Sequence, residues 1–284
     1  MVVFEKIAIL GLGLVGGAIG IAASRHGSAR VVSGLVRHQE LIPVAARLKA
    51  CTQATCDANE AVQDADLVIL ATGVQSIPGM AAETLPQMKS GAILTDVGST
   101  KERLVAALEK LCKKQKKPAI RYVGSHPIAG SEKRGLAYAQ KVLLSGAICV
   151  MTPTDRSDPE AVDQLGRFWS SLGLRVRTLA PEVHDRILAR TSHVPHLAAA
   201  ALMNLQTPEA APFCGGGFKD MTRVAEGDPD LWAEICAENP AAIAAALREL
   251  SGELEQQAGW LEKGDLAALK EHLATAQRRR IHGL

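Results

Sequence analysis

The chain has few aromatic residues and almost no excess charge of either sign. Aromatic side chains make up 3% of its 284 residues, and 32 basic residues against 30 acidic ones leave a formal net charge of +2. Proteins that bind single-stranded nucleic acid stack bases on aromatic rings, and a polyanion is attracted by a strongly basic surface. We therefore expect no nucleic-acid partner.

Paired cysteine motifs are also missing. Six cysteines are present, and none of them forms a C-x-x-C pair. Secreted disulfide frameworks and zinc sites depend on such regular spacings. The pattern predicts reduced, inert thiols in a cytoplasmic protein, and we expect no metal.

One long uncharged run covers residues 7–23. It is short for a bilayer span, contains five glycines and is not preceded by the basic segment of a signal peptide. We interpret it as a buried strand and a helix joined by a glycine turn, and we expect no membrane association.

Short apolar runs alternate with helical patterns over the first 179 residues. The predicted strands are residues 6–10, 31–36, 66–71, 92–96, 120–124, 147–151 and 175–179, and the predicted helices are 14–26, 40–50, 102–112 and 159–172. Such alternation indicates an α/β fold with helices on both faces of a mostly parallel, Rossmann-type sheet. Beyond it only helical patterns remain, at 181–205, 230–237, 240–260 and 265–280. We predict a Rossmann domain over residues 1–179 and an all-α domain over residues 180–284.

The sequence GLGLVG follows the first predicted strand and opens the first predicted helix. In that context a G-x-G-x-x-G pattern indicates a dinucleotide site. The first glycine permits the tight turn, the second lets a pyrophosphate approach the backbone, and the third lets the helix pack on the strand. The phosphates then bind N–H groups at the helix N-terminus. The residues expected at the cofactor are Gly11, Leu12, Gly13, Leu14, Val15 and Gly16.

Arg37 and His38 stand at the end of the second predicted strand, where an NAD site would carry an acid. No acid is present there. A guanidinium holds a 2′-phosphate, which a carboxylate would repel. We therefore predict NADP as the preferred cofactor, with NAD as the alternative if Arg37 is only a surface residue.

Small residues follow two more of the predicted strands. Thr72 and Val74 come after the strand at 66–71, and Ser99 comes after the strand at 92–96. The carboxyl ends of parallel strands line the ligand crevice of such a sheet. We expect these residues at the cofactor, although an ordinary strand-exit turn explains Thr72 equally well.

His126 lies in the stretch GSHPIAGSEKRG, directly after the strand predicted at 120–124. Pro127 fixes the local backbone and biases His126 towards an extended conformation, and Gly130 permits a turn. We interpret the stretch as a stiff turn that holds one imidazole beside a nicotinamide. A core histidine with one backbone hydrogen bond is the alternative.

Several motifs together resemble the prephenate/arogenate dehydrogenases of tyrosine biosynthesis, over nearly the whole chain. They are GLGLVGGAIG, DVGSTK, GSHPIAGSEKRG, HD at 184–185, SHVPH at 192–196, GGGFKDMTR at 215–223 and DPDLW at 228–232. The resemblance implies a Rossmann domain followed by a helical domain that forms a homodimer. It also implies a reaction: the carbinol carbon of a cyclohexadienol gives hydride to NAD(P)⁺, and loss of CO₂ makes the ring aromatic.

The resemblance also implies roles for individual residues. His126 binds the ring hydroxyl and takes its proton, as a neutral imidazole can at pH 7, and Ser99 bonds near this histidine and the nicotinamide. The remaining residues are expected around the substrate, with Arg223 on a substrate carboxylate. These substrate residues are Ser131, Glu132, Lys133, His193, His196, Lys219, Arg223 and Trp232.

Other interpretations of these residues stay open. Lys219 and Arg223 also fit a solvated helix face, and Trp232 also fits plain helix packing. His193 and His196, with His184 as a third ligand, would also suit a metal. The choice between prephenate and arogenate is open as well, because Glu132 would favour the ammonium of arogenate and Lys133 the anionic side chain of prephenate.

Two other functions fit the same two-domain pattern. One is a β-hydroxyacid or imine reductase, although those families usually place a catalytic lysine or aspartate in the helical domain. The other is a redox sensor that binds NADPH and signals through a helical dimer, which would need no imidazole fixed at the sheet edge. The sequence SHPIAG favours the dehydrogenase.

Overall fold

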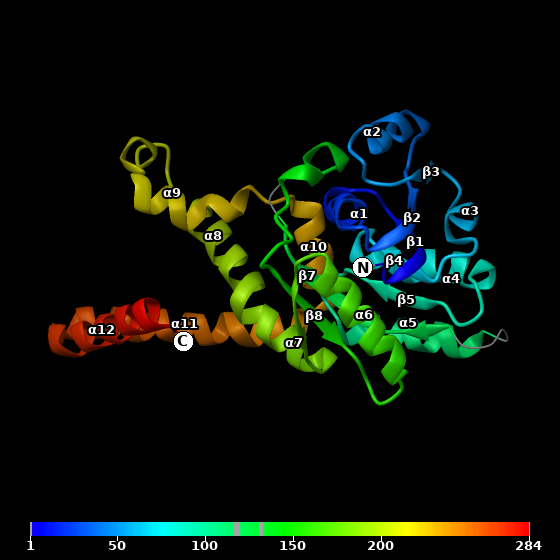
Figure 1. Cartoon of the computed structure of the whole chain (residues 1–284). Coiled ribbons are helices and arrows are strands. Elements are labelled where there is room, and N and C mark those ends of the chain that lie inside the picture. The colour runs from blue at the N-terminus through cyan, green and yellow to red at the C-terminus, as the bar shows by residue number, and fades with distance from the viewer. Residues whose placement is uncertain (1, 116–119, 131–132, 284) are drawn as a thin grey trace. The chain divides into compact units, whose positions relative to one another are not determined.

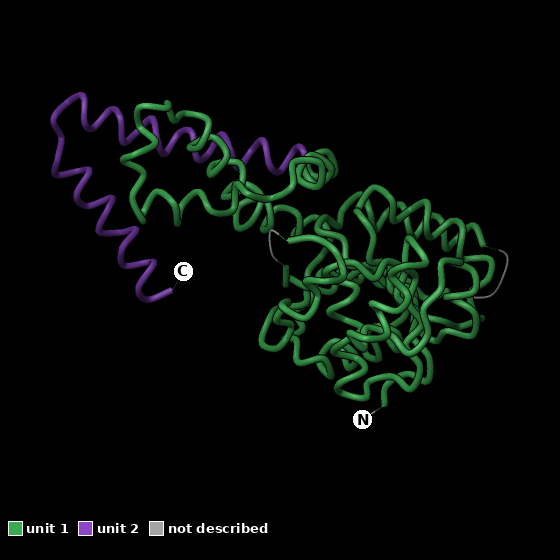
Figure 2. Tube along the Cα trace, turned by 90° about the horizontal axis from the view of Figure 1, so that it is seen from above, with its two compact units in different colours: residues 1–239 green, residues 240–284 purple. Residues whose placement is uncertain are grey.

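The computed structural model describes residues 2–115, 120–130 and 133–283. Ser131 and Glu132, two of the predicted substrate residues, lie outside the described residues. The chain divides into two compact units, residues 1–239 and residues 240–284 (Figure 2). The first unit holds the sheets together with four of the helices that follow residue 180, and the second holds the last two helices. The predicted domain boundary at residue 180 stays a prediction.

The central sheet of the first unit has six parallel strands in the order β3-β2-β1-β4-β5-β6 (Figure 1). The strands are β1 (Phe4–Leu10), β2 (Ala29–Leu35), β3 (Gln53–Thr55), β4 (Leu67–Leu70), β5 (Ile93–Asp96) and β6 (Arg121–Tyr122). Leu10 is in register with Leu35 of β2 and Leu70 of β4, so the carboxyl ends of these three strands form one edge. The strand order reverses between β1 and β4, which is where such sheets bind ligands.

Helices cover both faces of this sheet, as the alternating pattern predicted. They are α1 (Leu14–His26), α2 (Ile42–Arg47), α3 (Ala58–Val62), α4 (Ile77–Thr84), α5 (Glu102–Lys114) and α6 (Pro159–Ser171). One buried cluster joins the sheet to α1 and α6, and a second joins it to α3, α4 and α5. These two cores hold the strand ends in place because close-packed side chains leave them no room to shift.

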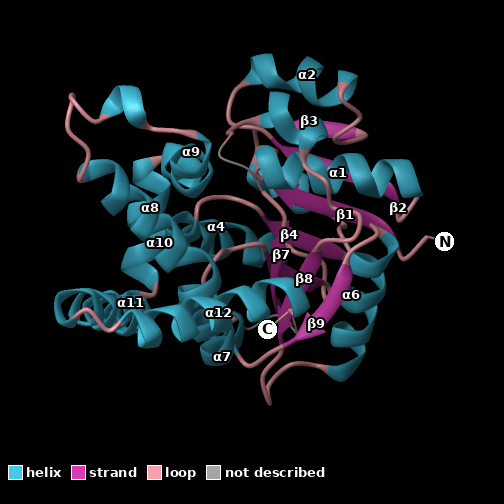
Figure 3. Cartoon of the chain, turned by 90° about the vertical axis from the view of Figure 1, so that its left-hand side faces the viewer, coloured by secondary structure: helices cyan, strands magenta, loops and turns pink. Residues whose placement is uncertain are grey.

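A second sheet, in the order β7-β8-β9, corrects the prediction for the histidine stretch (Figure 3). Its strands are β7 (Gly124–Ile128), β8 (Ile148–Thr152) and β9 (Arg175–Thr178). The single strand expected at 120–124 ends with β6 at Tyr122, and a new strand begins at Gly124. His126 is therefore not on a turn but within β7, opposite Val150 of the antiparallel β8. Pro127 is compatible with this position because β7 is an edge strand.

Ser125 connects the two sheets. Its hydroxyl oxygen accepts hydrogen bonds from Thr95 Oγ1 of β5 at 2.9 Å and from Trp169 Nε1 of α6 at 3.0 Å. All three side chains are buried. The residue next to His126 is thus fixed to the central sheet and to its covering helix.

The helix predicted at 181–205 contains a π-helical turn. It consists of α7 (Pro181–Leu188), a π-helix over Ala189–His193, and α8 (Val194–Asn204). Pro195 has no N–H to donate to the carbonyl of Thr191, and the widened turn lies just before it. Two more helices complete the first unit, α9 (Gly216–Thr222) and α10 (Pro229–Glu238).

The second unit is a helical hairpin of α11 (Pro240–Lys263) and α12 (Leu266–His282). Gly264 adopts φ +67° between the helices, a conformation that favours glycine, and Asp265 caps α12 by accepting the N–H of Ala268 at 3.0 Å. Trp260 packs beside His272 across the hairpin, with ring centroids 5.3 Å apart. Among the described residues, no helix is both long and apolar enough to cross a bilayer.

Candidate active site

The glycine turn after β1 leaves the N-terminus of α1 open. Gly11 has φ +109°, and a Cβ on Gly16 would lie 2.1 Å from the carbonyl oxygen of Gly11, so both positions require glycine. Gly13 caps the helix without a side-chain hydrogen bond, no acid stands in the first turn, and a Cβ built on Gly13 would meet no atom within 4 Å. The first N–H groups of a helix have no partner within the helix, and at an N-terminus without a side-chain cap they fit a pyrophosphate. Leu12 is buried against Gly34, so it offers the cofactor only its backbone.

Arg37 and His38 follow β2 beside this turn, and both are exposed. The N–H of Leu12 donates to the carbonyl of Leu35 at 2.9 Å, which joins the glycine turn to the end of β2. Arg37 thus stands two residues after the end of β2, the strand end beside which an adenosine ribose would lie. No acid replaces it there, because the next one along the chain is the exposed Glu40.

Two buried oxygen atoms without partners lie near the end of β4. A Cβ on Gly11 would lie 3.1 Å from Thr72 Cγ2, so Thr72 sits against the glycine turn, and its Oγ1 is buried with no hydrogen-bond partner among the described residues. Glu234 Oε2 of α10 is also buried with no hydrogen-bond partner among the described residues. It lies close to Gly73, where a Cβ built on that glycine would be 2.9 Å away. Buried polar atoms normally have partners, so these two fit hydrogen bonds to a bound cofactor. Val74 is buried, so its side chain contributes packing.

The turn after β5 is held by a fully buried carboxylate, Asp96. It accepts the N–H of Gly98 and the hydroxyl of Tyr122, both at 2.8 Å, and forms an ion pair with Lys101. Burial and the negative charge of Asp96 raise the pKa of Tyr122 well above its usual value, so the phenol stays a donor. These bonds fix the backbone on both sides of the half-buried Ser99.

A chain of three side chains extends from the start of α5 to β7. Asp185 Oδ1 accepts the N–H of Lys101 at 2.7 Å, and Oδ2 accepts the N–H of Glu102 at 2.9 Å. The same Oδ1 lies 2.8 Å from His184 Nδ1, and His184 Nε2 lies 2.9 Å from His126 Nδ1. His184 and Asp185 are buried on α7, whereas His126 is partly exposed. The imidazole of His126 is therefore held by two elements that are far apart in the sequence.

The electrostatics of this cluster keep its histidines neutral. Burial is the main cause that lowers the pKa of His126 well below its usual value, and His184, Lys101 and His193 lower it further. Burial also lowers the pKa of His184, against the opposite effect of Asp185. A neutral imidazole has one ring nitrogen free to accept a proton, so His126 is suited to act as a base at neutral pH.

His193, at the end of the π-helical turn, belongs to the same cluster. It is buried, its Nδ1 has no hydrogen-bond partner among the described residues, and burial lowers its pKa to about 4. His196 stacks on Trp232 with ring centroids 3.6 Å apart, and His193 meets that indole edge-on at 6.2 Å. These contacts fit Trp232 both as a wall of the substrate pocket and as plain helix packing, so the role of Trp232 stays a prediction. The role of both histidines at the substrate stays a prediction.

The other predicted substrate residues are exposed side chains. Lys219 lies on α9, Arg223 opens the following 3₁₀ turn Arg223–Glu226, and Lys133 precedes Arg134. Arg134 forms an ion pair of 2.6 Å with Asp228 at the start of α10, which ties this stretch to the helices that follow residue 180. Whether Lys133, Lys219 and Arg223 bind a substrate stays a prediction.

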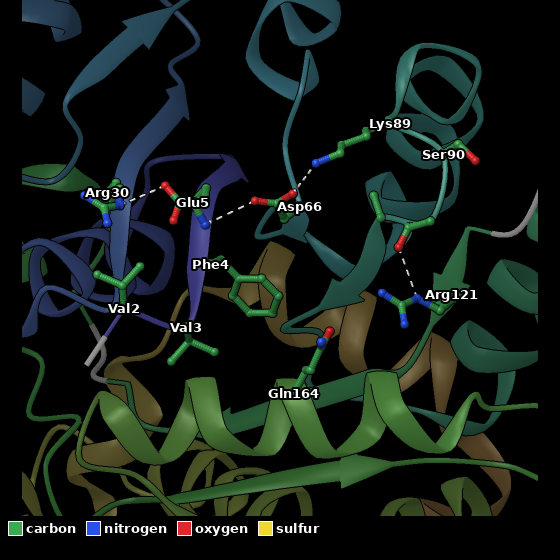
Figure 4. A pocket seen from close by; sticks show the side chains of 12 residues that line it. Val2, Val3, Phe4, Glu5, Arg30, Asp66, Lys89, Ser90, Arg121 and Gln164 are labelled. Carbon is green, nitrogen blue, oxygen red and sulfur yellow. Dashed lines mark hydrogen bonds and ion pairs between the residues drawn. The ribbon is translucent and has the colours of Figure 1, made fainter.

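A hollow of about 590 Å³ lies at the opposite, amino edge of the central sheet (Figure 4). Charged side chains in the hollow form ion pairs with one another: Lys89 pairs with Asp66 at 2.5 Å and Arg30 with Glu5 at 2.8 Å. Arg121 Nε donates to the carbonyl of Gly91 at 3.1 Å. These bonds stabilise the strand ends, and the described residues that line the hollow form no catalytic set.

The sequence motifs did not assign a role to every residue that the structure places at His126. Asp185, Asp96 and Lys101 were named only as members of the motifs HD and DVGSTK, and His184 only as a member of HD and as a possible metal ligand. Nothing local in the sequence indicated that His184 bonds to His126, 58 residues away.

Comparison with known proteins gives consistent matches over both parts of the chain. The model of the prephenate dehydrogenase nucleotide-binding domain matches residues 19–178, and that of the prephenate dehydrogenase dimerization domain matches residues 180–275. The cyclohexadienyl dehydrogenase of Zymomonas mobilis is 30% identical over 99% of this chain and 97% of its own length. The prephenate dehydrogenase of Bacillus subtilis is also 30% identical, over 96% of this chain and 74% of its own length.

Solved structures agree with these matches. Prephenate dehydrogenase from Aquifex aeolicus, in complex with hydroxyphenyl propionate and NAD⁺, superposes with a TM-score of 0.89 at 30% identity, over 98% of each chain. Arogenate dehydrogenase from Synechocystis gives a TM-score of 0.83 at 26% identity, over 98% of this chain and 100% of that one. A 3-hydroxyisobutyrate dehydrogenase from Mycobacterium tuberculosis, at 0.52 and 16% identity over 77% of this chain and 67% of that one, shares only the fold.

Proposed function

This chain belongs to the prephenate dehydrogenase family, and from that premise we propose that it oxidises and decarboxylates prephenate, arogenate or both, with His126 as the base. The family is one of pyridine-nucleotide-dependent oxidoreductases acting on a small-molecule substrate. The observation that carries the role of His126 is its bond of 2.9 Å to the buried His184, at the carboxyl edge of the central sheet. The products would be 4-hydroxyphenylpyruvate from prephenate and tyrosine from arogenate.

The residues present fit the proposed chemistry. A bound nicotinamide supplies the acceptor for the hydride that leaves the carbinol carbon. His126 accepts the proton of the ring hydroxyl as the C=O bond forms, which general-base catalysis accelerates by about 10²–10⁴-fold. The bond to the ring carboxylate then breaks, CO₂ leaves, and its electron pair enters the ring. The imidazolium returns the proton to the oxygen, which leaves a phenol, so no net proton is lost from His126.

We propose NADP as the preferred cofactor. Support comes from the exposed Arg37 at the end of β2 and from the absence of an acid at residues 36–38. A carboxylate there would accept the ribose 2′-hydroxyl of NAD, whereas a guanidinium pairs with a 2′-phosphate. The Aquifex relative was solved in complex with NAD⁺, so NAD is the alternative cofactor for this chain. Gly11, Gly13, Gly16 and Thr72 would hold the parts that both cofactors share.

Substrate anchors and the assembly belong to the same proposal. We assign Lys133, Lys219 and Arg223 to the substrate carboxylates, since a charge-assisted hydrogen bond contributes about 1.5–3 kcal/mol. We also propose a cytoplasmic homodimer formed through the helical part after residue 180, which the dimerization-domain match over residues 180–275 supports.

One experiment tests the function directly. Prephenate and arogenate are each mixed with NAD⁺ and with NADP⁺, and the absorbance of the reduced cofactor is followed. We expect turnover with at least one substrate and a higher kcat/KM with NADP⁺. No turnover in any of the four combinations would refute the function, and a higher kcat/KM with NAD⁺ would refute only the cofactor preference.

A further inference from the structure

We propose that Asp185 and His184 hold His126 in the tautomer that carries its proton on Nδ1, so that Nε2 is left to accept the substrate proton. His184 and Asp185 are then positioning residues: they act through His126 and not on the substrate. The proposal rests on the proposed function for its catalytic meaning, but the tautomer itself is a property of the free protein.

Asp185 accepts hydrogen bonds on both oxygens of its carboxylate. Two of its bonds come from the backbone N–H groups of Lys101 and Glu102 at the start of α5, at 2.7 and 2.9 Å. A helix N-terminus favours a negative charge, and the two carboxylate oxygens act as the acceptors of these N–H groups. Its third contact, 2.8 Å from His184 Nδ1, is therefore a bond that the N–H of His184 donates.

That donation determines which nitrogen of His184 is the acceptor. Burial keeps His184 neutral by lowering its pKa, and a neutral imidazole carries its proton on one nitrogen only. With the proton on Nδ1, the lone pair lies on Nε2. The contact of 2.9 Å between His184 Nε2 and His126 Nδ1 then requires the proton on His126 Nδ1.

The opposite arrangement would place two acceptors against each other. If His126 carried its proton on Nε2, its Nδ1 lone pair would face the Nε2 lone pair of His184. If His184 instead carried its proton on Nε2, the two imidazoles could still bond. The Nδ1 lone pair of His184 would then face the Asp185 carboxylate. Leaving a buried group unsatisfied costs about 1–3 kcal/mol, which corresponds to a preference of about 5- to 150-fold for the proposed tautomer.

The hydrogen bonds that link Asp185, His184 and His126 can also stay in place when His126 is protonated. After His126 accepts a proton on Nε2, its Nδ1–H still donates to His184, which still donates to Asp185. No group in the chain has to rotate during the reaction, and the negative charge of Asp185 lies two hydrogen bonds from the imidazolium. Fixed dipoles that need no reorganisation are the kind that lower a barrier.

The first test reads the tautomer without substrate. In protein labelled with ¹⁵N-histidine, NMR separates protonated from unprotonated ring nitrogens, and the His126 signals are assigned by their loss in His126→Asn. We expect a protonated Nδ1 and an unprotonated Nε2 on His126. The reverse assignment would overturn the proposal even if the protein is fully active. The expected assignment with no turnover on either substrate would instead refute the function and leave the tautomer standing.

The second test compares two replacements of His184. His184→Phe removes the acceptor, and we expect mixed tautomers on His126 and a kcat lower by about 10²-fold, with KM nearly unchanged. His184→Gln keeps an oxygen that can accept from His126 Nδ1, and we expect it to restore most of the lost kcat. Thr84→Val is the matched control, because Thr84 is buried and its hydroxyl donates to the Met80 carbonyl of its own helix, at 2.8 Å. A His184→Phe protein with unchanged tautomer and unchanged kcat would overturn the proposal, as would equal losses of kcat in His184→Phe and His184→Gln.

Discussion

His126 Nδ1 lies 2.9 Å from His184 Nε2, and the two rings meet edge to face with their centroids 5.1 Å apart. The bond joins an edge strand of the second sheet to the first helix after residue 180. It therefore places the proposed base where two parts of the fold meet, and its orientation depends on both.

His126→Asn should lower kcat by about 10²–10⁴-fold, because it removes the proposed general base. Cofactor affinity should change little, since the glycine turn and Arg37 are untouched. Steady-state kinetics and a cofactor titration followed by fluorescence measure both quantities. His26→Asn, an exposed histidine at the end of α1, is the control and should behave as the wild type. Unchanged turnover in His126→Asn would exclude His126 from the mechanism.

The pH profile should show an acid limb displaced to low pH. Catalysis needs neutral His126, and its pKa is lowered well below the usual value of 6.5 by burial and by neighbouring positive charge. Activity is therefore retained as pH falls through 6.5 and is lost only when pH falls through the lowered pKa. The measurement is kcat/KM of the free enzyme from pH 8 downwards. A limb centred at or above 6.5 would mean that another group controls the rate.

Arg37→Ala should weaken NADP binding and leave NAD binding nearly unchanged. The lost charge-assisted bond is worth about 1.5–3 kcal/mol, which is about 10- to 150-fold in Kd. Titration of each cofactor into the variant measures the difference. Arg25→Ala, an exposed arginine in the last turn of α1, is the control. An equal loss for both cofactors would contradict the role of Arg37 at a 2′-phosphate.

Sequence patterns predicted the central sheet well because its strands are buried on both faces. Leu67–Leu70 and Ile93–Asp96 are continuous buried runs, and the predicted strands overlap them closely. Elements with short or mixed sequences were not predicted, including the three-residue β3 and the helix α4, which contains Pro78 near its start. These form because neighbours pack on them, which a local pattern does not encode.

In the candidate site, too, some features could be predicted from the sequence and others could not. The glycine turn was predictable because its function needs glycine at fixed spacings within one segment. The strand position of His126 was not, because it depends on pairing with β8, which begins at Ile148. The Asp185–His184–His126 chain was not predictable either, because its geometry arises only when α5, α7 and β7 pack together.

Lys101→Met should destabilise the fold strongly because it leaves Asp96 buried without its cation. Both side chains of this pair are fully buried, and removing one partner of a buried pair costs about 3–5 kcal/mol. Lys89→Met is the matched control: Lys89 pairs with Asp66 at the surface, where a pair contributes about 1 kcal/mol or less. Denaturant unfolding measures both variants. Equal losses would mean that Asp96 finds other support when Lys101 is absent.

Stability should also fall in acid through His193. Its folded pKa is about 4, below the usual 6.5, because burial disfavours the charged ring. Its contribution is therefore complete above pH 6.5 and is lost progressively as pH falls from 6.5 to 4, where the unfolded chain binds a proton that the folded protein refuses. The difference amounts to about 3 kcal/mol. Comparing the free energy of unfolding from pH 7 to pH 4 in wild type and His193→Asn isolates this effect, since Asn does not titrate and the acids and other histidines are common to both proteins. We expect a shallower decline in the variant, and parallel declines would show that His193 titrates in the folded protein much as it does in the unfolded chain.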